Sequence, residues 1–358
     1  MPRGLAVAYG SAGVLHALHE VSGLVEQELR VELLAGEVGS RRPAGLYLGQ
    51  AGVAWVLDEL GHARTARQQL AAAMDVGPLT AGAGLLAGAA GIGLACLRLW
   101  LRDRDAETLG WATRCGQLLA CSAVPDEHGV HWPAAPSGPA GSSGPAAPSY
   151  PVENSGPVGN SWPVGNSYPV GNSWPGWPIG YASGPSGPAL YLLYLAQVTG
   201  DQSWQTLGRA ALDSDLGHFG SAAVRPVPSC WDAGSAGLAT ALLRYLAVLP
   251  DQALVERWEW CRAELLGVRA GGSQLFHGLT GCGMASLDAA ELIEDRECLD
   301  NAWRIADQLL GAEGQLPDTA DLATGVSGVL LFLNRLLVTG PGRLTNANFV
   351  LDELLEPN

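Results

Sequence analysis

The chain has 358 residues, of which 47% are hydrophobic and only 15% charged, a composition typical of a protein with a large buried core. Its net charge of −15 argues against a nucleic-acid partner and against an anionic membrane surface. All 20 basic residues are arginines, which excludes P-loop, protein-kinase and Schiff-base chemistry, because each of these needs a lysine.

A Gly-x-x-Gly tetrapeptide recurs seven times along the chain. Successive copies lie 39, 39, 96, 50, 44 and 47 residues apart, so one gap has about twice the usual length. Self-similarity at a nearly constant period predicts a repeat protein. The copies begin at Gly10, Gly49, Gly88, Gly184, Gly234, Gly278 and Gly325.

Each tetrapeptide precedes an apolar stretch that predicts a buried helix. The stretches VAWVLDEL after Gly52 and VLLFLNRLLV after Gly328 are typical. Amphipathic stretches between them predict half-exposed helices, at residues 25–34, 63–74, 255–266 and 299–310. An open solenoid would need polar end repeats, and both end repeats here are as apolar as the middle ones. We therefore expect an all-α fold, an α/α toroid of seven inner and seven outer helices.

The glycines immediately precede the predicted inner helices. Because glycine has no Cβ, the N-termini of these helices can converge at one end of the ring. We also expect their free N–H groups and positive dipole ends to face a common cavity, which suits a substrate that develops negative charge. Tight packing alone is the alternative explanation of the same glycines.

The double-length gap contains a tract rich in proline, glycine, serine and asparagine, at about residues 123–178. From Pro151 onward a six-residue unit close to PVGNSW repeats, and this spacing of prolines forbids a helix. We interpret residues 1–358 as one domain that carries this tract as an insertion. The insertion is either a disordered loop or a mobile lid that presents Trp162, Tyr168 and Trp174 to a peptide.

The seven repeats and several local phrases resemble the lanthionine synthetase C-like family. The phrases include LAVAYGSAGVLHALHEVSG, CWDAGSAGLATALLRYL and LFHGLTGCG, and the resemblance covers the chain except for the insertion. They look most like the cyclase domain of class III (kinase–lyase–cyclase) lanthipeptide synthetases. The resemblance implies an α/α toroid that adds Cys thiols of a precursor peptide to dehydroalanine or dehydrobutyrine, which forms lanthionine or labionin thioether rings.

Zinc-dependent members of this family bind zinc through two thiolates and one imidazole, in the motifs W-C-x-G and C-H-G. Asp232 and Phe276 stand at the two cysteine positions of this chain, so only His277 remains. Cys230 lies two positions before Asp232 and is not expected to point the same way. A further family histidine, before the fourth repeat helix, is replaced by Ser183. The resemblance to class III domains therefore implies no metal and no other cofactor.

Without zinc, three residues are the candidates for the chemistry. His277 is the candidate acid and base, because imidazole titrates near neutral pH. Asp232 can orient or charge-stabilise His277 if the fifth and sixth repeats are neighbours, and Tyr181 is a candidate proton donor. The alternatives are a relic histidine that bonds to backbone and an N-cap role for Asp232.

Three further residues are candidates for substrate binding: Trp231, Ser183 and Phe276. The alternative for Trp231 is a place in the core. His16 and His19 lie on the first predicted inner helix, and we expect them to be structural.

The seven cysteines are scattered and form no CxxC pair, which predicts buried thiols in a reducing compartment. The first residues do not resemble a signal peptide, and no apolar run reaches the length of a bilayer span. We expect a cytoplasmic protein, and the composition hints at a GC-rich bacterial gene.

The leading hypothesis is a zinc-independent lanthipeptide cyclase that acts on a precursor peptide, with kinase and lyase domains in cis or in trans. The alternative is a catalytically silent peptide-binding scaffold that supports the kinase and the lyase. A glycosidase built on another α/α toroid is disfavoured, because it needs paired carboxylates and the Gly-x-x-Gly loops offer only Asp232.

Overall fold

The computed structural model describes residues 4–23, 43–77, 82–133, 180–220, 229–268, 271–311, 316–339 and 349–355. These ranges contain twelve α-helices and one two-stranded hairpin. Seven of the helices begin at a Gly-x-x-Gly tetrapeptide and are the inner helices: α1 (Ser11–Ser22), α3 (Gln50–Glu59), α5 (Ala89–Asp103), α7 (Ser186–Thr199), α9 (Ser235–Val248), α11 (Leu279–Leu292) and α13 (Val326–Val338). The described outer helices are α4 (Ala63–Val76), α6 (Ala106–Ser122), α8 (Gln202–Gly220), α10 (Gln252–Gly267) and α12 (Arg296–Leu310).

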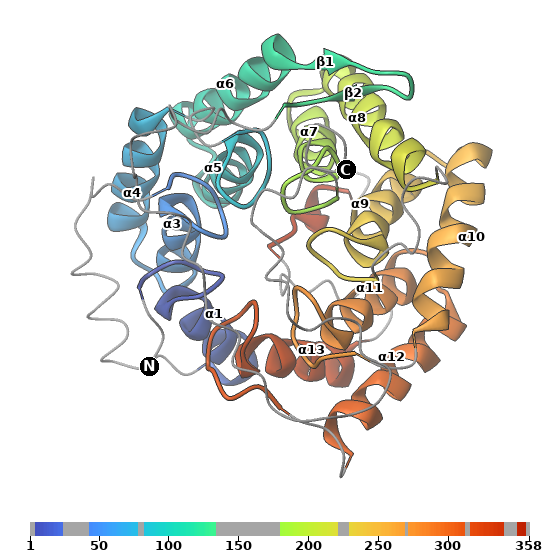
Figure 1. Cartoon of the computed structure of the whole chain (residues 1–358). Helices are drawn as coiled ribbons and strands as arrows, with labels where there is room; N and C mark the ends of the chain where they lie inside the picture. Colours follow the sequence, from blue (N-terminus) through green and yellow to red (C-terminus); the bar gives the residue numbers. More distant parts are fainter. Residues whose placement is uncertain are drawn as a thin grey trace, which may run out of the picture.

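The inner helices form a closed ring. Each packs against the next inner helix along the chain, and α13 returns to pack against α1. The outer helices surround them, as Figure 1 shows. The predicted all-α toroid is therefore confirmed, whereas the amphipathic stretch at 25–34 lies outside the described residues. No helix within the described ranges is long and apolar enough to cross a membrane.

A small hairpin interrupts the helical pattern at the start of the predicted insertion. Its strands β1 (Val124–Pro125) and β2 (Val130–His131) pair antiparallel. Trp132, directly after β2, is buried and donates its indole N–H to the carbonyl of Leu119 at 3.0 Å. The insertion as predicted begins too early, because residues 124–132 are packed against α6 and α8. The rest of the tract, with Trp162, Tyr168 and Trp174, lies outside the described residues.

The seven loops before the inner helices are joined by a cyclic chain of backbone hydrogen bonds. In each loop, the residue two positions before the tetrapeptide donates its N–H to the carbonyl of the corresponding residue in the next loop, at 2.8–3.3 Å. The last loop donates to the first, so the chain of bonds closes. We call these residues the loop ring: Ala8, Tyr47, Leu86, Ala182, Asp232, Phe276 and Ala323.

The second glycine of each tetrapeptide lies against backbone of its own loop. A Cβ at this position would overlap the carbonyl oxygen of the residue six positions earlier, in all seven repeats. In the fifth repeat, for example, a methyl group on Gly237 would meet the carbonyl oxygen of Trp231 and the Cβ of Tyr181. The glycines are thus required by close backbone approach, as the sequence suggested.

The expectation that free helix N–H groups face a central cavity is wrong for the inner helices whose first bonds are described. The first residue of α3, Gln50, donates to the carbonyl of Pro43, and the equivalent residues of α1, α5, α11 and α13 bond their own loops in the same way. On α7, the N–H of Ser186 donates to the buried carboxylate of Asp215 at 2.9 Å. The first N–H groups of these helices therefore already have hydrogen-bond acceptors within the fold.

A second repeated interaction joins the outer helices: an arginine side chain pairs with the aspartate that caps the next described outer helix. Asp105, Asp251 and Asp295 cap α6, α10 and α12 by accepting a backbone N–H of the first turn. An arginine on the preceding described outer helix pairs with each cap, at 2.6–2.8 Å. These arginines are Arg67 on α4, Arg209 on α8 and Arg262 on α10.

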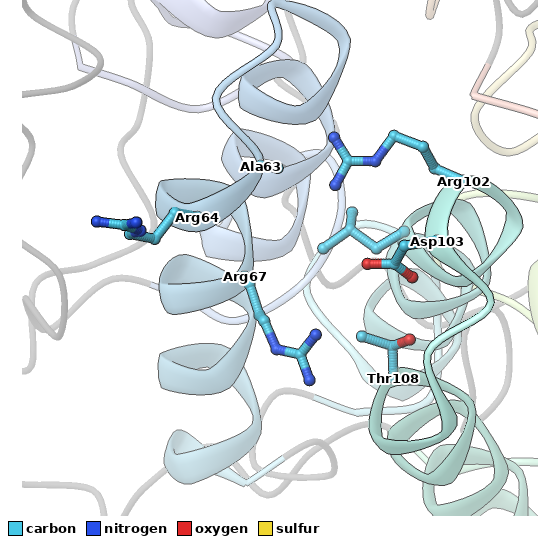
Figure 2. Close-up of a pocket in the computed structure, with 7 residues that line it drawn as sticks. Ala63, Arg64, Arg67, Arg102, Asp103 and Thr108 are labelled. Atoms are coloured by element: carbon cyan, nitrogen blue, oxygen red, sulfur yellow. The ribbon is translucent and has the colours of Figure 1, made fainter.

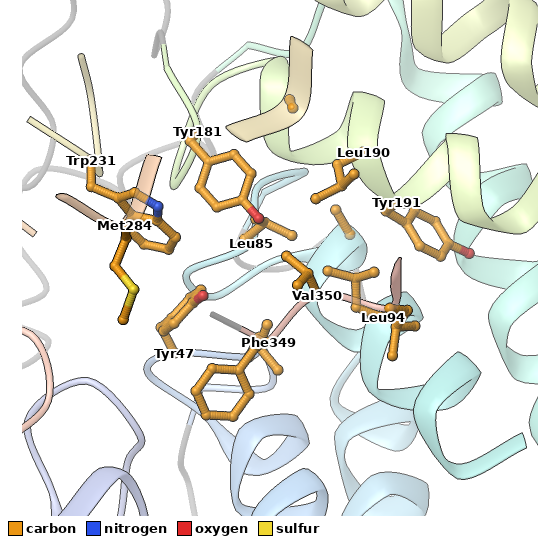
Figure 3. Packing of buried hydrophobic residues seen from close by; sticks show 14 of the residues in the cluster. Tyr47, Leu85, Leu94, Tyr181, Leu190, Tyr191, Trp231, Met284, Phe349 and Val350 are labelled. Atoms are coloured by element: carbon orange, nitrogen blue, oxygen red, sulfur yellow. The ribbon is translucent and has the colours of Figure 1, made fainter. Parts of the chain in front are cut away.

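The C-terminal segment, residues 349–355, fills the centre of the toroid (Figure 1). Phe349 packs edge-on against Tyr47 and Trp55, with ring centroids 5.6 and 5.3 Å apart. Asp352 accepts two hydrogen bonds from Arg244 on α9, both at 2.7 Å, and one from Tyr194 on α7. Figure 3 shows Phe349 and Val350 enclosed by side chains of several inner helices and loops.

A buried ionic network continues from this segment across the inner helices. Arg244 also binds Asp288 on α11 at 2.9 Å, and Asp288 in turn binds Arg335 on α13. Arg335 pairs with Glu291 as well. Each charge of this network therefore has at least one opposite partner, and removing a single member would leave a buried charge unmatched.

The glycine packing is testable with one substitution and one control. We expect Gly237→Ala to lower the free energy of unfolding by about 1–3 kcal/mol, because the new methyl group meets backbone that cannot move aside. Gly110 lies on an exposed face of α6, where an added methyl group would have no atom within 4 Å, so Gly110→Ala should stabilise by about 0.5–1 kcal/mol. Chemical denaturation measures both, and equal effects of the two would contradict the packing.

The buried ion pair gives a second test. Asp352→Ala removes one of the two carboxylates that bind Arg244, so the charge of this buried guanidinium is no longer fully balanced. We expect the free energy of unfolding to fall by about 3–5 kcal/mol. Glu107, which is paired with Arg67 but 60% exposed, is the control, and Glu107→Ala should cost less than about 1 kcal/mol. A small loss for Asp352→Ala in urea denaturation would show that the C-terminal segment is not held by this pair.

Candidate functional site

Two of the predicted site residues meet on the face of the toroid that carries the loops. Asp232 and Phe276 are consecutive members of the loop ring, and His277 follows Phe276 directly. The Nδ1 atom of His277 lies 3.1 Å from Oδ1 of Asp232. The condition that the fifth and sixth repeats be neighbours is met, since α9 packs against α11. The His277 side chain is 37% exposed and the Asp232 side chain 20%, so the pair is open to solvent.

The electrostatics of this pair favour a charged imidazole. Desolvation alone lowers the pKa of His277, but the hydrogen bond and the negative charge of Asp232 outweigh it, so the pKa is raised from its ordinary value of 6.5. The carboxylate of Asp232 lies against Nδ1, which favours a proton on that nitrogen. Asp232 therefore orients the imidazole ring.

Aromatic rings form the floor beneath this pair. Tyr181 and Trp231 are fully buried, with ring centroids 4.7 Å apart, and Phe276 lies 5.2 Å from Trp231. Figure 3 shows Tyr181 and Trp231 directed into the interior, together with Tyr47. Trp231 and Phe276, two of the predicted substrate-binding residues, are thus buried beneath the pair in this structure.

Tyr181 is buried with its hydroxyl group away from solvent, and that hydroxyl has no hydrogen-bond partner in the described part of the chain. Burial raises the pKa of Tyr181 well above its ordinary value, so the phenol keeps its proton. Ser183 is exposed, one position after the loop-ring residue Ala182, and occupies in the fourth repeat the position that His277 occupies in the sixth.

One residue that the sequence analysis set aside belongs to the site. Burial, together with the negative charge of Asp232, raises the pKa of the Cys230 thiol. A spacing of two residues suggested that Cys230 would point away from Asp232. Residues 231–233 form a turn, so the thiol still lies close enough to feel the carboxylate, and no pattern in the sequence signals this.

The donors at these positions do not fit the zinc site of the zinc-dependent cyclases. Phe276 contributes no ligand atom, and Asp232 is already paired with His277. Within the described ranges, one group of three His, Cys, Asp or Glu side chains has ligand atoms within 4.8 Å of one another. That group lies on α1 and α3, and not at the loop ring.

A recess of about 180 Å³ lies at the opposite end of the inner helices, between α4, α5 and α6. Figure 2 shows Arg67 on one side, facing Arg102, Asp103 and Thr108, whereas Arg64 points away from them. Arg67 is paired with Asp105 and Glu107, and Arg102 with Asp58. Its arginines therefore serve the packing of these helices, and we do not assign it to the site.

The comparisons with known proteins support the fold. No protein-family model matches the sequence, and no curated protein sequence matches it. Among solved structures, nisin cyclase is similar, with a TM-score of 0.57, 13% sequence identity, and coverage of 98% of this chain and 91% of that chain. The similarity extends over nearly the whole of both chains, so the toroid is shared as a complete architecture.

The coupling between Asp232 and His277 can be measured directly. Asp232→Asn removes the negative charge, so desolvation is no longer opposed and the pKa of His277 should fall below its ordinary value. Since the pKa of His277 is raised in the folded protein, the pair stabilises the fold at low pH, and this contribution disappears as the pH rises through the folded pKa. A histidine NMR titration reports the shift, and an unchanged pKa in Asp232→Asn would show that the pair is not coupled.

Proposed function

We propose that this protein is a lanthipeptide cyclase of the zinc-independent, class III type, which adds Cys thiols of a precursor peptide to dehydroalanine or dehydrobutyrine. The observation that carries the proposal is the exposed His277–Asp232 pair on the loop ring, at the positions where the resemblance places the reaction centre. The toroid shared with nisin cyclase, a protein whose name describes a cyclase, supports the same reaction class.

The pair can perform both proton transfers of the addition. Neutral His277 accepts the thiol proton at Nε2 while Asp232 holds Nδ1, and the sulfur then attacks the β-carbon of the dehydro residue. The π electrons move to form an enolate as the C–S bond forms. The imidazolium returns its proton to the α-carbon, so that overall the S–H bond adds across the C=C bond.

The charge of His277 also stabilises the enolate. The inner-helix N–H groups whose bonds are described are already used, so they do not form an oxyanion site. Once it has accepted the thiol proton, His277 is an imidazolium that Asp232 stabilises, and we expect this charge to lie where negative charge develops. We propose that Tyr181 acts beneath the pair only after a movement that exposes its hydroxyl, because it is buried in the present arrangement.

The remaining parts of the proposal concern substrate and partners. The C-terminal segment fills the lumen, so the precursor peptide is expected to bind across the loop ring, where Ser183 and His277 are exposed. The precursor must be phosphorylated and dehydrated first, and kinase and lyase domains are the partners that supply this. Lanthionine and labionin are both products of this chemistry.

A peptide-binding scaffold without catalysis is the second candidate. Phe276 and Ser183 in place of family zinc and acid–base positions favour it. A scaffold requires the loop-ring surface but not the titrating pair, so the two functions differ in their dependence on His277.

The decisive experiment incubates the protein with a dehydrated precursor and counts free thiols by alkylation and mass spectrometry. We expect stereoselective loss of thiols, and a decrease of about 10²-fold or more in rate for His277→Ala, the typical contribution of general acid–base catalysis. His128 is the matched control, because its side chain is 35% exposed and lies on the β1–β2 hairpin. His128→Ala should cyclise like the parent.

Two outcomes would overturn the proposal. Thiol loss at the uncatalysed rate, together with peptide binding to the loop ring, would identify a scaffold. Cyclisation at full rate by His277→Ala would show that another residue performs the proton transfers.

A further inference from the structure

A histidine and two glutamates converge between the first two inner helices, away from the loop ring. His16 and Glu20 are four residues apart on α1, and this spacing places them on one face of the helix. Glu59 is the last residue of α3, which packs against α1. One ligand atom from each of the three residues lies within 4.8 Å of the other two.

The site is enclosed. The His16 side chain has no exposed area and that of Glu59 is 4% exposed. The Phe349 ring of the C-terminal segment lies over His16, with centroids 4.4 Å apart. Phe349 contacts Tyr47, and Tyr47 contacts Phe276, so two layers of aromatic rings separate this cluster from the His277 side of the toroid.

Both carboxylate oxygens of Glu59 have contacts that orient the side chain. Its Oε1 atom accepts the indole N–H of Trp55 at 2.7 Å, while Oε2 lies 2.8 Å from Nδ1 of His16. Metal-binding carboxylates in proteins are commonly held by an outer hydrogen bond of this kind.

The charge balance of the cluster differs from that of the carboxylates in the buried ionic network. Asp288, Asp352 and Glu291 are each bound by an arginine side chain. Glu20 and Glu59 converge on a histidine instead, and Arg98, which also acts on Glu59, lies over the Trp55 ring and pairs with Glu353. Two carboxylates and one imidazole have the charge and donor types that a divalent transition-metal ion balances.

We propose that His16, Glu20 and Glu59 bind a divalent transition-metal ion, with Zn²⁺ as the first candidate, which fastens α1 to α3 beneath the C-terminal segment. The ion would take the place of the proton shared by His16 and Glu59. Ligand atoms on a tetrahedral zinc ion with bonds of about 2.0–2.1 Å are about 3.3 Å apart, so small side-chain rotations close the site.

The test uses the full chain, stripped with a chelator, dialysed against Zn²⁺ and desalted before metal analysis. We expect one tightly bound ion per chain, and at least tenfold weaker binding in Glu20→Gln. This variant keeps the size of the side chain and leaves the His16–Glu59 and Trp55–Glu59 contacts in place. Glu256→Gln, an exposed glutamate on the outer helix α10, makes the same charge change and should bind like the parent.

A spectroscopic and a thermal measurement separate this site from the loop ring. Co²⁺ should give visible d–d bands in the parent and in His277→Ala, but not in Glu20→Gln. Zn²⁺ should raise the unfolding midpoint of the parent and leave that of Glu20→Gln unchanged, because an ion that binds only the native state stabilises it. Metal binding that survives Glu20→Gln, that is lost in His277→Ala, or that is absent from the parent would each overturn the proposal.

Discussion

The cyclic chain of backbone hydrogen bonds through the loop ring is the constraint on which the rest of the structure depends. Seven loops can donate and accept in a closed circle only if each has the same backbone path and each is equally close to the axis. The second glycine of each tetrapeptide permits that path, because the loop carbonyl occupies the space of its Cβ. The inner helices then start at one level and close on one another, from α1 to α13. The toroid therefore follows from a local steric rule applied seven times.

This constraint also decides where a ligand can and cannot bind. The centre of the toroid is filled by the C-terminal segment and by rings such as Tyr47, Tyr181 and Trp231. The first N–H groups of most inner helices are used by their own loops. What remains accessible at this end is the outer surface of the loops, where the residue after each loop-ring member points toward solvent in the fourth and sixth repeats, as Ser183 and His277. At this end of the toroid, the polar side chains that a ligand can reach therefore lie on the outer surface of the loops.

Features that repeat along the chain were predictable from the sequence, whereas features that depend on a single tertiary contact were not. The glycine spacing and apolar stretches predicted the seven inner helices, and neighbouring repeats implied that Asp232 and His277 could meet. The packing of Phe349 and Asp352 in the centre was not predictable, because a short segment at the end of the chain has no periodicity. The electrostatic effect of Asp232 on Cys230 depends on the shape of one turn. His16 was expected to be structural, and its contact with Glu59, 43 residues away in the chain, could not be read from any repeat.

A ring held by backbone atoms explains how the centre of such a fold can change its chemistry without losing its shape. The loop-ring positions hold residues as different as Ala182, Asp232 and Phe276, yet all three make the same hydrogen bonds, because N–H and C=O groups do not depend on the side chain. A side-chain substitution at a loop-ring position therefore leaves the main-chain bonds of the ring in place. The side chains beneath the ring, among them the buried Trp231, Phe276 and Tyr181, pack against one another and not against the groups that hold the loops together. The loops can thus carry different side chains on an unchanged backbone ring, which is the condition for one architecture to serve different surface chemistries.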